Sequence, residues 1–473
     1  MNRAYATLDN ESVQTSSRLH TRWPQTYEQG VNSRLPSPAL KQTFTFQPDT
    51  PSPESFGILS PHDKNSAESH QHYEVTIAIK SSFQSAVFNS VNVLLGVGIL
   101  SGPFALRSSG MLAGGVLFIF FAGVTNYTGK LLGKCLGYQA GMQTYPDIGQ
   151  AAFGMYGRVF ISVVFFTELF TATAMFYILM GDTLAALVPS IAESKMTIIC
   201  YLIVLPTTWT RHLSLLSYFS IIGILSSIFC LYTILYVGLT TDNGEVGSLT
   251  EPQPVQWIAS NDRVPLSIGL TMVAFGGHSV FPSICSSMKR REEFPRVLNI
   301  AYSIVAIIYG AVELCGYFMY GEMTKKEITL NLMDTFPGHL VKLMLWTIVL
   351  NPMSKLAITL NPVALAVEEL FLDTSERAPV TCRTKTVGIF IRTALATAAL
   401  MCALFVPEFA RITSFIGAFF AMLVSVFFPC VCYLRLFWSV LGEKEKWLNV
   451  LIATISLVLA YIGTVASFSA PVS

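Results

Sequence analysis

Long apolar segments alternate with short polar connections from about residue 83 to residue 467. Most of these segments approach or exceed the roughly 20 apolar residues that cross the hydrocarbon core of a bilayer as a helix. The pattern predicts an all-α polytopic membrane protein with eleven transmembrane helices. The predicted spans are residues 83–106, 111–133, 158–187, 195–210, 214–238, 265–288, 297–320, 340–370, 386–406, 412–438 and 447–467.

Composition supports this fold class and excludes several functions. Of the 473 residues, 52% are hydrophobic and 12% are charged, whereas about 25% of the residues of an ordinary soluble domain are charged. The net charge of +1 creates no field that would attract nucleic acid. The sequence contains no zinc-type Cys/His spacing, no nucleotide-binding loop and no nucleophile motif. We therefore expect no nucleic-acid partner, no metal, no cofactor and no enzyme activity.

Residues 1–80 differ from the rest of the chain. They are rich in Ser, Thr, Gln and Pro, carry charges of both signs and show no sustained apolar period. Such a segment cannot bury enough apolar surface to offset the entropy of folding. We predict a disordered cytosolic tail at residues 1–80 and a membrane domain at residues 81–473.

The positively charged residues near the predicted spans indicate the orientation of the chain. Fourteen Lys and Arg residues lie in the even-numbered connections, and seven lie on the opposite side. Positive flanks accumulate on the cytosolic side because they resist translocation. This distribution predicts a cytosolic N-terminus and, with eleven spans, a lumenal C-terminus.

Glycines interrupt the first apolar segment at mid-membrane depth. Gly96 and Gly98 lie close together, and Gly102 and Pro103 follow them. We predict that the helix breaks near Gly96 to Gly98. The freed backbone groups must face protein or a polar cavity, where a substrate carboxylate would be a suitable partner for the N–H groups. Close helix packing through small residues is the alternative explanation.

The sixth apolar segment repeats this feature at Gly276, Gly277 and Pro282. Two interrupted helices in corresponding positions indicate an inverted repeat, with a ligand bound near the midplane where the two halves meet. The predicted halves are residues 83–238 and 265–438, and residues 447–467 form an additional helix.

Several ionisable residues lie inside apolar segments. His278 is in the second interruption, where it could line a cavity, take up a proton or satisfy the broken backbone as a neutral ring. Glu168, Glu313 and Lys355 lie deep in their segments, so we expect them to face the protein interior. They could exchange protons with water in a cavity that opens to alternate sides, although a structural ion pair is the alternative. Arg392 lies nearer a membrane surface, and we expect it to reach the headgroups.

Several stretches together resemble the amino acid/auxin permease family, most closely its vacuolar amino acid transporter branch. They are Asn92–Pro103, Thr144–Gly154, Leu213–Tyr218, His278–Pro282 and Asn351–Lys355. The resemblance implies a LeuT-like (APC-type) fold of two inverted five-helix repeats, with the amino acid held between the broken first and sixth helices. It also implies a secondary active transporter of small neutral amino acids that needs no cofactor.

The same resemblance suggests roles for individual residues. Backbone groups of the first interruption would bind the substrate carboxylate, and carbonyls of the second would accept from its ammonium. The substrate-binding candidates are Asn92, Gly96, Val97, Gly98, Ile99, Phe275, Gly276, Gly277 and His278. Lys355 would place an ammonium where sodium-coupled relatives hold a cation, which favours protons as the coupling ion. Glu168 also fits the pattern of this branch, whereas Glu313 has no counterpart in it; both remain candidates for proton coupling.

The predicted activity is proton antiport of neutral amino acids into the vacuolar lumen. Three alternatives remain: proton-coupled export from the vacuole, import at the plasma membrane, and an amino acid sensor that signals through its tail. Residues Glu54–Leu59 resemble an acidic dileucine sorting signal, which would be read by adaptor complexes on the route to vacuoles. The predicted partners are therefore the amino acid, protons, the lipid bilayer and such adaptors.

Overall fold

The computed structural model describes residues 81–96, 98–139, 141–209, 219–242, 245–259, 263–371, 382–406 and 408–469. Three groups of predictions lie outside these residues: those for the tail, including the Glu54–Leu59 signal, those for Val97 and those for the Leu213–Tyr218 stretch.

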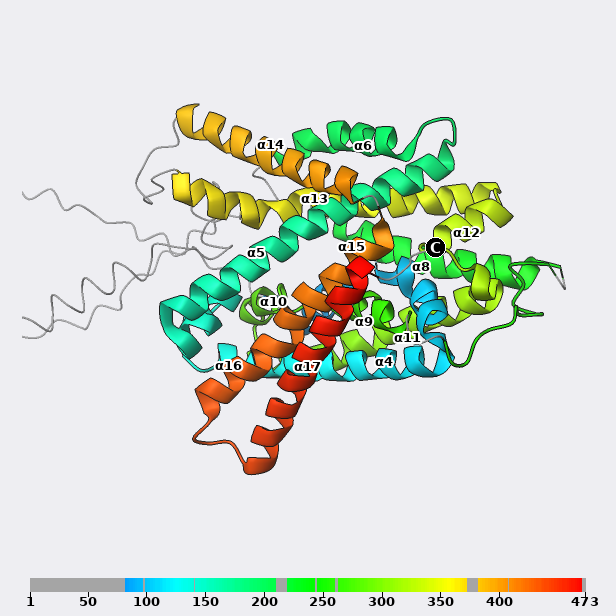
Figure 1. Cartoon of the computed structure of the whole chain (residues 1–473). Coiled ribbons are helices and arrows are strands. Elements are labelled where there is room, and N and C mark those ends of the chain that lie inside the picture. The colour runs from blue at the N-terminus through cyan, green and yellow to red at the C-terminus, as the bar shows by residue number, and fades with distance from the viewer. Residues whose placement is uncertain are drawn as a thin grey trace, which may run out of the picture.

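Helices make up most of the described chain (Figure 1). In order, they are α3 (Phe83–Leu94), α4 (Gly98–Leu136), α5 (Tyr145–Leu187), α6 (Glu193–Thr208), α8 (Phe219–Thr240), α9 (Val264–Ala274), α10 (Phe281–Ser287), α11 (Phe294–Tyr320), α12 (Ile328–Thr335), α13 (His339–Phe371), α14 (Cys382–Phe405), α15 (Phe409–Phe415), α16 (Phe428–Phe437) and α17 (Glu443–Ser469). Two π-helical stretches, Ile416–Ala421 and Leu423–Phe427, lie between α15 and α16.

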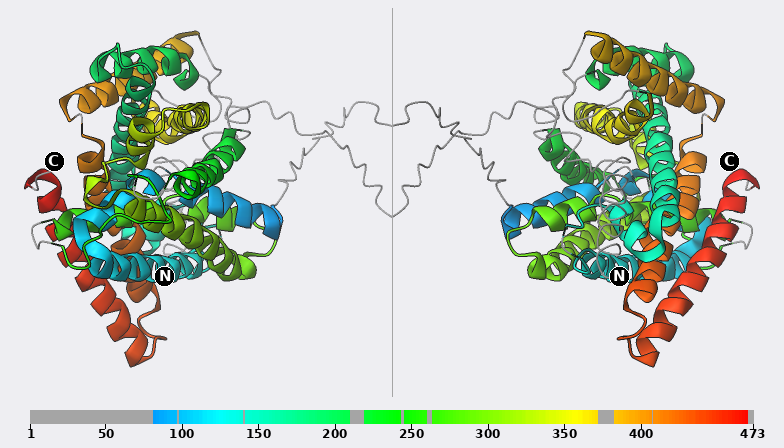
Figure 2. Two further views of the ribbon diagram at one scale, coloured as in Figure 1. Left: turned by 90° about the vertical axis from the view of Figure 1, so that its right-hand side faces the viewer. Right: turned by 90° about the vertical axis from the view of Figure 1, so that its left-hand side faces the viewer.

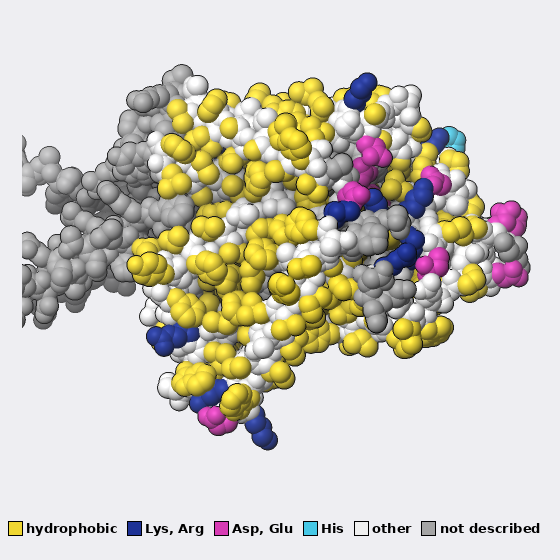
Figure 3. Space-filling model, in the orientation of Figure 1, with side chains coloured by type: hydrophobic (Ala, Val, Ile, Leu, Met, Phe, Trp, Pro, Cys, Tyr) yellow, Lys and Arg dark blue, Asp and Glu magenta, His cyan; other side chains and the backbone are white. Residues whose placement is uncertain are grey.

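The helices have the length and surface of a membrane protein. Within the described ranges, eight helical stretches are long and apolar enough to cross a bilayer. Figure 3 shows hydrophobic side chains over the middle of one face, whereas charged side chains gather near α12 and around the turn between α16 and α17. The prediction of a helical membrane protein is confirmed.

Glycines turn the chain inside two of the longest helices. Gly110 in α4 and Gly154 in α5 have positive φ values of 75° and 69°, a conformation that glycine adopts without steric cost. Gly110 lies between the first two predicted spans, which are joined without a loop. Before Gly154, Asp147 accepts hydrogen bonds from two backbone N–H groups and forms a 3.0 Å ion pair with Arg158. The Thr144–Gly154 stretch therefore forms a capped turn at the start of α5.

The helices form two groups that lie side by side (Figure 2). In one group, α4 packs against α9 and α11, and α3 packs against α11. In the other, α13 packs against α5 and α14, and α5 packs against α6. Helix α8 contacts α13, α11 and α3, so it lies between the groups, while α17 packs against α9 on the outside.

A short backbone pairing joins the start of α3 to the end of α10. The N–H of Ser81 donates to the carbonyl of Ser287 at 2.8 Å, and the N–H of Lys289 donates to the carbonyl of Ser81 at 3.1 Å. The chain that enters the first helix is thereby attached to the chain that leaves the second interrupted segment.

Helix α9 approaches the first π-helical stretch so closely that backbone contacts backbone. A methyl group at Gly417 would overlap the carbonyl oxygen of Gly269, and one at Gly269 would overlap the carbonyl oxygen of Ser414. Small residues permit this approach in membrane proteins, where dispersion contacts hold helices together.

We expect the Gly417→Val substitution to lower the thermal stability of the purified protein, because the added side chain must separate two backbones; overpacking of this kind costs about 1–3 kcal/mol or more. Gly115→Val is the matched control, since among the described residues no atom outside the adjoining backbone of its own helix lies within 4 Å of a Cβ at Gly115. Melting can be followed by fluorescence-detected size-exclusion chromatography. Equal melting temperatures for the two variants would contradict the close contact.

Arg392 does not reach the headgroups, so the sequence-based expectation is wrong. Its side chain is 3% exposed, and Nε lies 2.9 Å from Oε1 of Glu368 on α13. Its Nη1 also donates to the carbonyl of Thr208 at the end of α6. Burial makes an unpaired charge costly, so this arginine connects three helices instead of extending to the surface.

Two carboxyl groups meet where α12 covers the end of α5. Glu327, the residue before α12, is fully buried, and its carboxyl lies within hydrogen-bonding reach of that of Asp182. Two carboxyl groups can be hydrogen bonded only through a proton. Burial, and then the charge of Asp182, raises the pKa of Glu327 well above its usual range. Glu193 adds negative charge near this pair, and Lys326 adds positive charge near Asp182.

We expect the folded protein to become less stable as the pH rises from about 5 to 7.5. A raised carboxyl pKa means that the folded state holds a proton that the unfolded state has released, so raising the pH favours unfolding. Glu327→Gln should therefore raise the melting temperature at pH 7.5 and reduce its dependence on pH. Glu245→Gln, at an exposed loop position, should change neither the melting temperature at pH 7.5 nor its dependence on pH. A Glu327→Gln protein that melts earlier than the wild type at pH 7.5 would contradict the shared proton.

Candidate functional site

Both glycine-interrupted segments are broken helices, as the sequence predicts. Helix α3 ends at Leu94 and α4 begins at Gly98, which leaves Gly96 in the connection. Helix α9 ends at Ala274 and α10 begins at Phe281. We call these connections the first break and the second break.

The two breaks lie against each other. A Cβ on Gly98 would lie 2.8 Å from the Cα of Ala274, and a Cβ on Gly277 would lie 3.1 Å from Cδ2 of Leu94. The end of each first half-helix therefore lies beside the other break. This is the juxtaposition that corresponding interruptions in two halves would produce.

Two side chains from other helices satisfy the backbone at the first break. The hydroxyl of Tyr309 on α11 donates to the carbonyl of Leu94 at 2.6 Å and accepts from the N–H of Gly96 at 2.9 Å. Nζ of Lys355 on α13 donates to the carbonyl of Leu95 at 3.1 Å. A cation is well placed there, because the C-terminal end of a helix carries partial negative charge.

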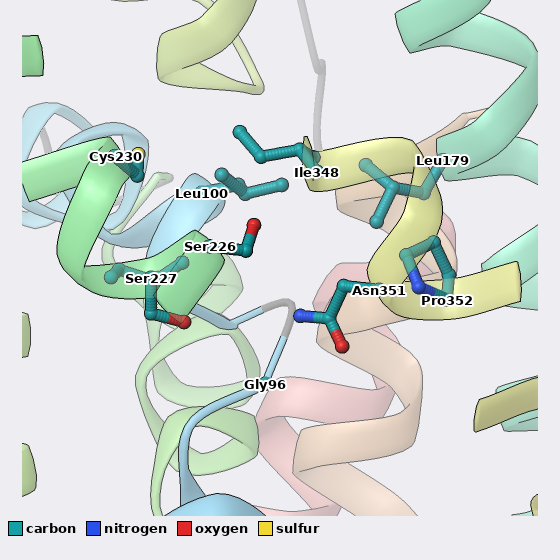
Figure 4. Close-up of a pocket in the computed structure, with 10 residues that line it drawn as sticks. Gly96, Leu100, Leu179, Ser226, Ser227, Cys230, Ile348, Asn351 and Pro352 are labelled. Carbon is teal, nitrogen blue, oxygen red and sulfur yellow. The ribbon is translucent and has the colours of Figure 1, made fainter. Parts of the chain in front are cut away.

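A cavity opens beside the first break, between α4, α5, α8 and α13 (Figure 4). Its free interior volume is about 10 Å³, which is room for about one water molecule. Its polar lining comes from the backbone of Gly96 and the side chains of Ser226, Ser227 and Asn351, whereas its other residues are mainly apolar. Figure 4 shows the amide of Asn351 directed from α13 toward the chain that carries Gly96. The cavity thus combines a few polar groups with an apolar wall, as small-molecule sites do.

Two asparagine side chains converge near this cavity. Oδ1 of Asn351 and Oδ1 of Asn92 would lie 3.0 and 3.4 Å from a Cβ on Gly223 of α8. Both oxygens are buried, and neither has a hydrogen-bond partner among the described residues. Unpaired buried acceptors are uncommon and costly, so this corner of the site is suited to a ligand that donates hydrogen bonds.

The candidates at the second break do not line this cavity. Phe275 is fully buried, and its carbonyl accepts from the hydroxyl of Tyr302 at 3.2 Å. Nε2 of the buried His278 lies 3.0 Å from Oγ1 of Thr128, on the side of α4. Gly276 is half-buried, and a Cβ placed there would be in ordinary van der Waals contact with Cβ of Ala421 at 3.5 Å and the carbonyl oxygen of Val273 at 3.6 Å.

Glu168, Glu313 and Lys355 do not form ion pairs with one another. In the part of the chain that the structure describes, no carboxylate lies within 4.0 Å of Lys355 Nζ. Oε2 of Glu168 is buried without a hydrogen-bond partner among the described residues. Glu313 packs against α4, with Oε1 2.8 Å from a Cβ placed on Gly102. Neither carboxylate lines the cavity, whereas Lys355 directly contacts the first break.

Sequence reasoning identified the breaks and Lys355 but missed most of their supporting residues. Tyr302 and Tyr309 are seven residues apart on α11, and this spacing places them on one helix face. That periodicity is detectable in the sequence, although nothing there indicates which carbonyls the hydroxyls reach. Ser226 and Ser227 lie in an ordinary apolar helix and give no comparable signal.

Two broken helices packed together beside a partly polar cavity, within a bundle of membrane-spanning helices, define a membrane transporter of the broken-helix class. A solved structure has the same fold: Mhp1, a nucleobase-cation-symport-1 family transporter with bromovinylhydantoin bound. It aligns with a TM-score of 0.50 and 13% identity over 82% of this chain and 91% of that one. The inward-facing conformation of Mhp1 also aligns with a TM-score of 0.50 and covers 89% of that chain.

The model of the family described as "Transmembrane amino acid transporter protein" matches residues 79–469. The chain belongs to this family, which confirms the resemblance found in its motifs and places it among transporters instead of enzymes. Among curated relatives in Arabidopsis thaliana, amino acid transporter AVT1D is 38% identical over 82% of this chain and 70% of its own length. Amino acid transporter AVT1B is 34% identical over 96% of this chain and 89% of its own length.

Proposed function

We propose that this protein is a proton-coupled secondary transporter that exchanges lumenal protons for cytosolic neutral amino acids at the vacuolar membrane. Family membership and the names of the Arabidopsis relatives support amino acids as the substrate class. The acidic dileucine-like stretch at Glu54–Leu59 and the distribution of Lys and Arg support a vacuolar location with a cytosolic N-terminus and a lumenal C-terminus.

The fold proposed for this function has eleven spans in a LeuT-like arrangement. Spans one to five and six to ten form two inverted halves, at about residues 83–238 and 265–438, and α17 is the additional helix. The positions of the breaks support this division, because one break lies near the start of each half and the two are in contact. Residues 1–80 are proposed as a separate cytosolic tail that presents the sorting signal.

Lys355 is the single observation that carries the proton-coupling proposal. Its ammonium donates to the carbonyl of Leu95, directly after α3, and no carboxylate among the described residues lies within ion-pair distance. A protonated lysine is attracted to this helix end, and a deprotonated lysine is held less strongly. Release of the proton therefore loosens the contact between α13 and α3. The loss of this contact links the charge of Lys355 to the position of the first half-helix. Glu168 and Glu313 are further candidates for carrying the proton.

We propose that the substrate binds at the first break, with its carboxylate on the backbone N–H of Gly98 and on that of Ile99, which would exchange its long 3.5 Å bond to the carbonyl of Gly96 for the carboxylate. Its ammonium would donate to the unpaired amide oxygens of Asn92 and Asn351, which suit a hydrogen-bond donor. The backbone of Gly276 would border the substrate from the second break. The cavity as it stands has room for about one water molecule, so this proposal requires the helices around it to move apart when the amino acid enters.

We expect Lys355→Met to abolish amino acid uptake driven by a pH step, because the substituted residue cannot carry a proton or bind the Leu95 carbonyl. Uptake into reconstituted proteoliposomes should fall to that of protein-free vesicles. Lys342→Met is the matched control, since Lys342 is exposed on the same helix, and it should retain wild-type uptake.

A Lys355→Met protein that elutes and melts like the wild type yet still responds to the pH step would reject the role of Lys355. Counterflow of a panel of labelled amino acids would separately test the substrate class. Amino acid-dependent binding of partners with negligible flux would instead support the sensor alternative.

A further inference from the structure

Helix α11 presents two buried tyrosines to the two breaks from one of its faces. Tyr302 and Tyr309 are 4% and 1% exposed. They are separated by seven residues, which is close to two helical turns, so their side chains leave the helix in nearly the same direction.

Each hydroxyl binds the backbone at the end of a different half-helix. Tyr302 donates to the carbonyl of Phe275, directly after α9, at 3.2 Å. Tyr309 bridges the carbonyl of Leu94 and the N–H of Gly96, at 2.6 and 2.9 Å. Backbone groups at helix ends have no intrahelical partner, and in a membrane these bonds replace the water that is missing there.

The rings of the two tyrosines also contact Phe275, the residue that follows α9. The Phe275 ring is nearly parallel to that of Tyr302, with centroids 6.4 Å apart and an angle of 15°. It meets the ring of Tyr309 edge-on, with centroids 6.2 Å apart and an angle of 77°. Phe275 is thus in contact with both tyrosines, one of which binds its own carbonyl while the other binds the first break.

We propose that Tyr302 and Tyr309 are positioning residues that set the distance between the two breaks and thereby the geometry of the substrate site. One rigid helix holds both breaks, so neither can shift along the membrane normal without losing a buried hydrogen bond. This inference deepens the proposed function, because it assumes that the breaks bind the substrate.

The test uses Tyr→Phe substitutions in the full-length protein, which keep the ring and remove only the hydroxyl. Tyr317→Phe is the matched control. Tyr317 is also fully buried on α11, but its hydroxyl accepts from the N–H of Gln256 and donates to Glu322, away from both breaks. All three variants therefore lose one buried hydroxyl from the same helix.

We expect Tyr302→Phe and Tyr309→Phe each to raise the KM for counterflow of neutral amino acids by about fivefold to tenfold, with Vmax changed less, because each leaves a backbone acceptor at a break unpaired. Tyr317→Phe should leave KM unchanged. In hydrogen–deuterium exchange, Tyr309→Phe should increase exchange in peptides containing Gly96, and Tyr302→Phe in peptides containing Gly276.

An equal rise in KM for Tyr317→Phe would show a general loss of stability and overturn the proposal. Unchanged hydrogen exchange at Gly96 in Tyr309→Phe would also overturn it. If the wild type exchanges no amino acid, the proposed function fails, while hydrogen exchange at the two breaks still decides whether the tyrosines position them.

Discussion

The structure depends on one constraint: a backbone N–H or C=O group at membrane depth must have a hydrogen-bond partner inside the protein. Unbroken helices meet this requirement by themselves. The two broken helices do not, and the protein supplies the missing partners from other helices. Tyr302, Tyr309 and Lys355 each bind a carbonyl at the end of a half-helix. The candidate site is built around backbone groups that, in an uninterrupted transmembrane helix, are hydrogen bonded within the helix itself.

The same constraint explains why the first break is held in place and still has hydrogen-bond acceptors free beside it. Its terminal carbonyls are already occupied, which holds the end of α3 in place, while Asn92 and Asn351 leave acceptors free beside the cavity. If the ligand alone supplied the hydrogen bonds for the backbone of the break, the break would be disordered whenever the ligand was absent. In the proposed site, the protein would determine the geometry, and the ligand would have to match only the remaining polar groups.

Local features of the sequence were sufficient to predict the breaks and the isolated lysine. Glycine lowers helix stability at any position, which is why the pairs Gly96 and Gly98, and Gly276 and Gly277, indicate breaks. A charged side chain in an apolar segment raises the free energy of the protein wherever it lies. Contacts between distant segments could not be derived in this way. The bond from Arg392 to the carbonyl of Thr208 joins α14 to α6, two helices far apart in the sequence, so the burial of Arg392 was not predicted. The turn at Gly110 falls in the connection predicted between the first two spans, although its positive φ has no hydrophobic signature and was not predicted.

The pairing of Ser81 with the end of α10 has a mechanical consequence. Two backbone hydrogen bonds attach the entry of α3 to the exit of α10, so the outer ends of these two half-helices share an anchor. If α3 swings away from the bundle, it must either pull α10 with it or break both bonds.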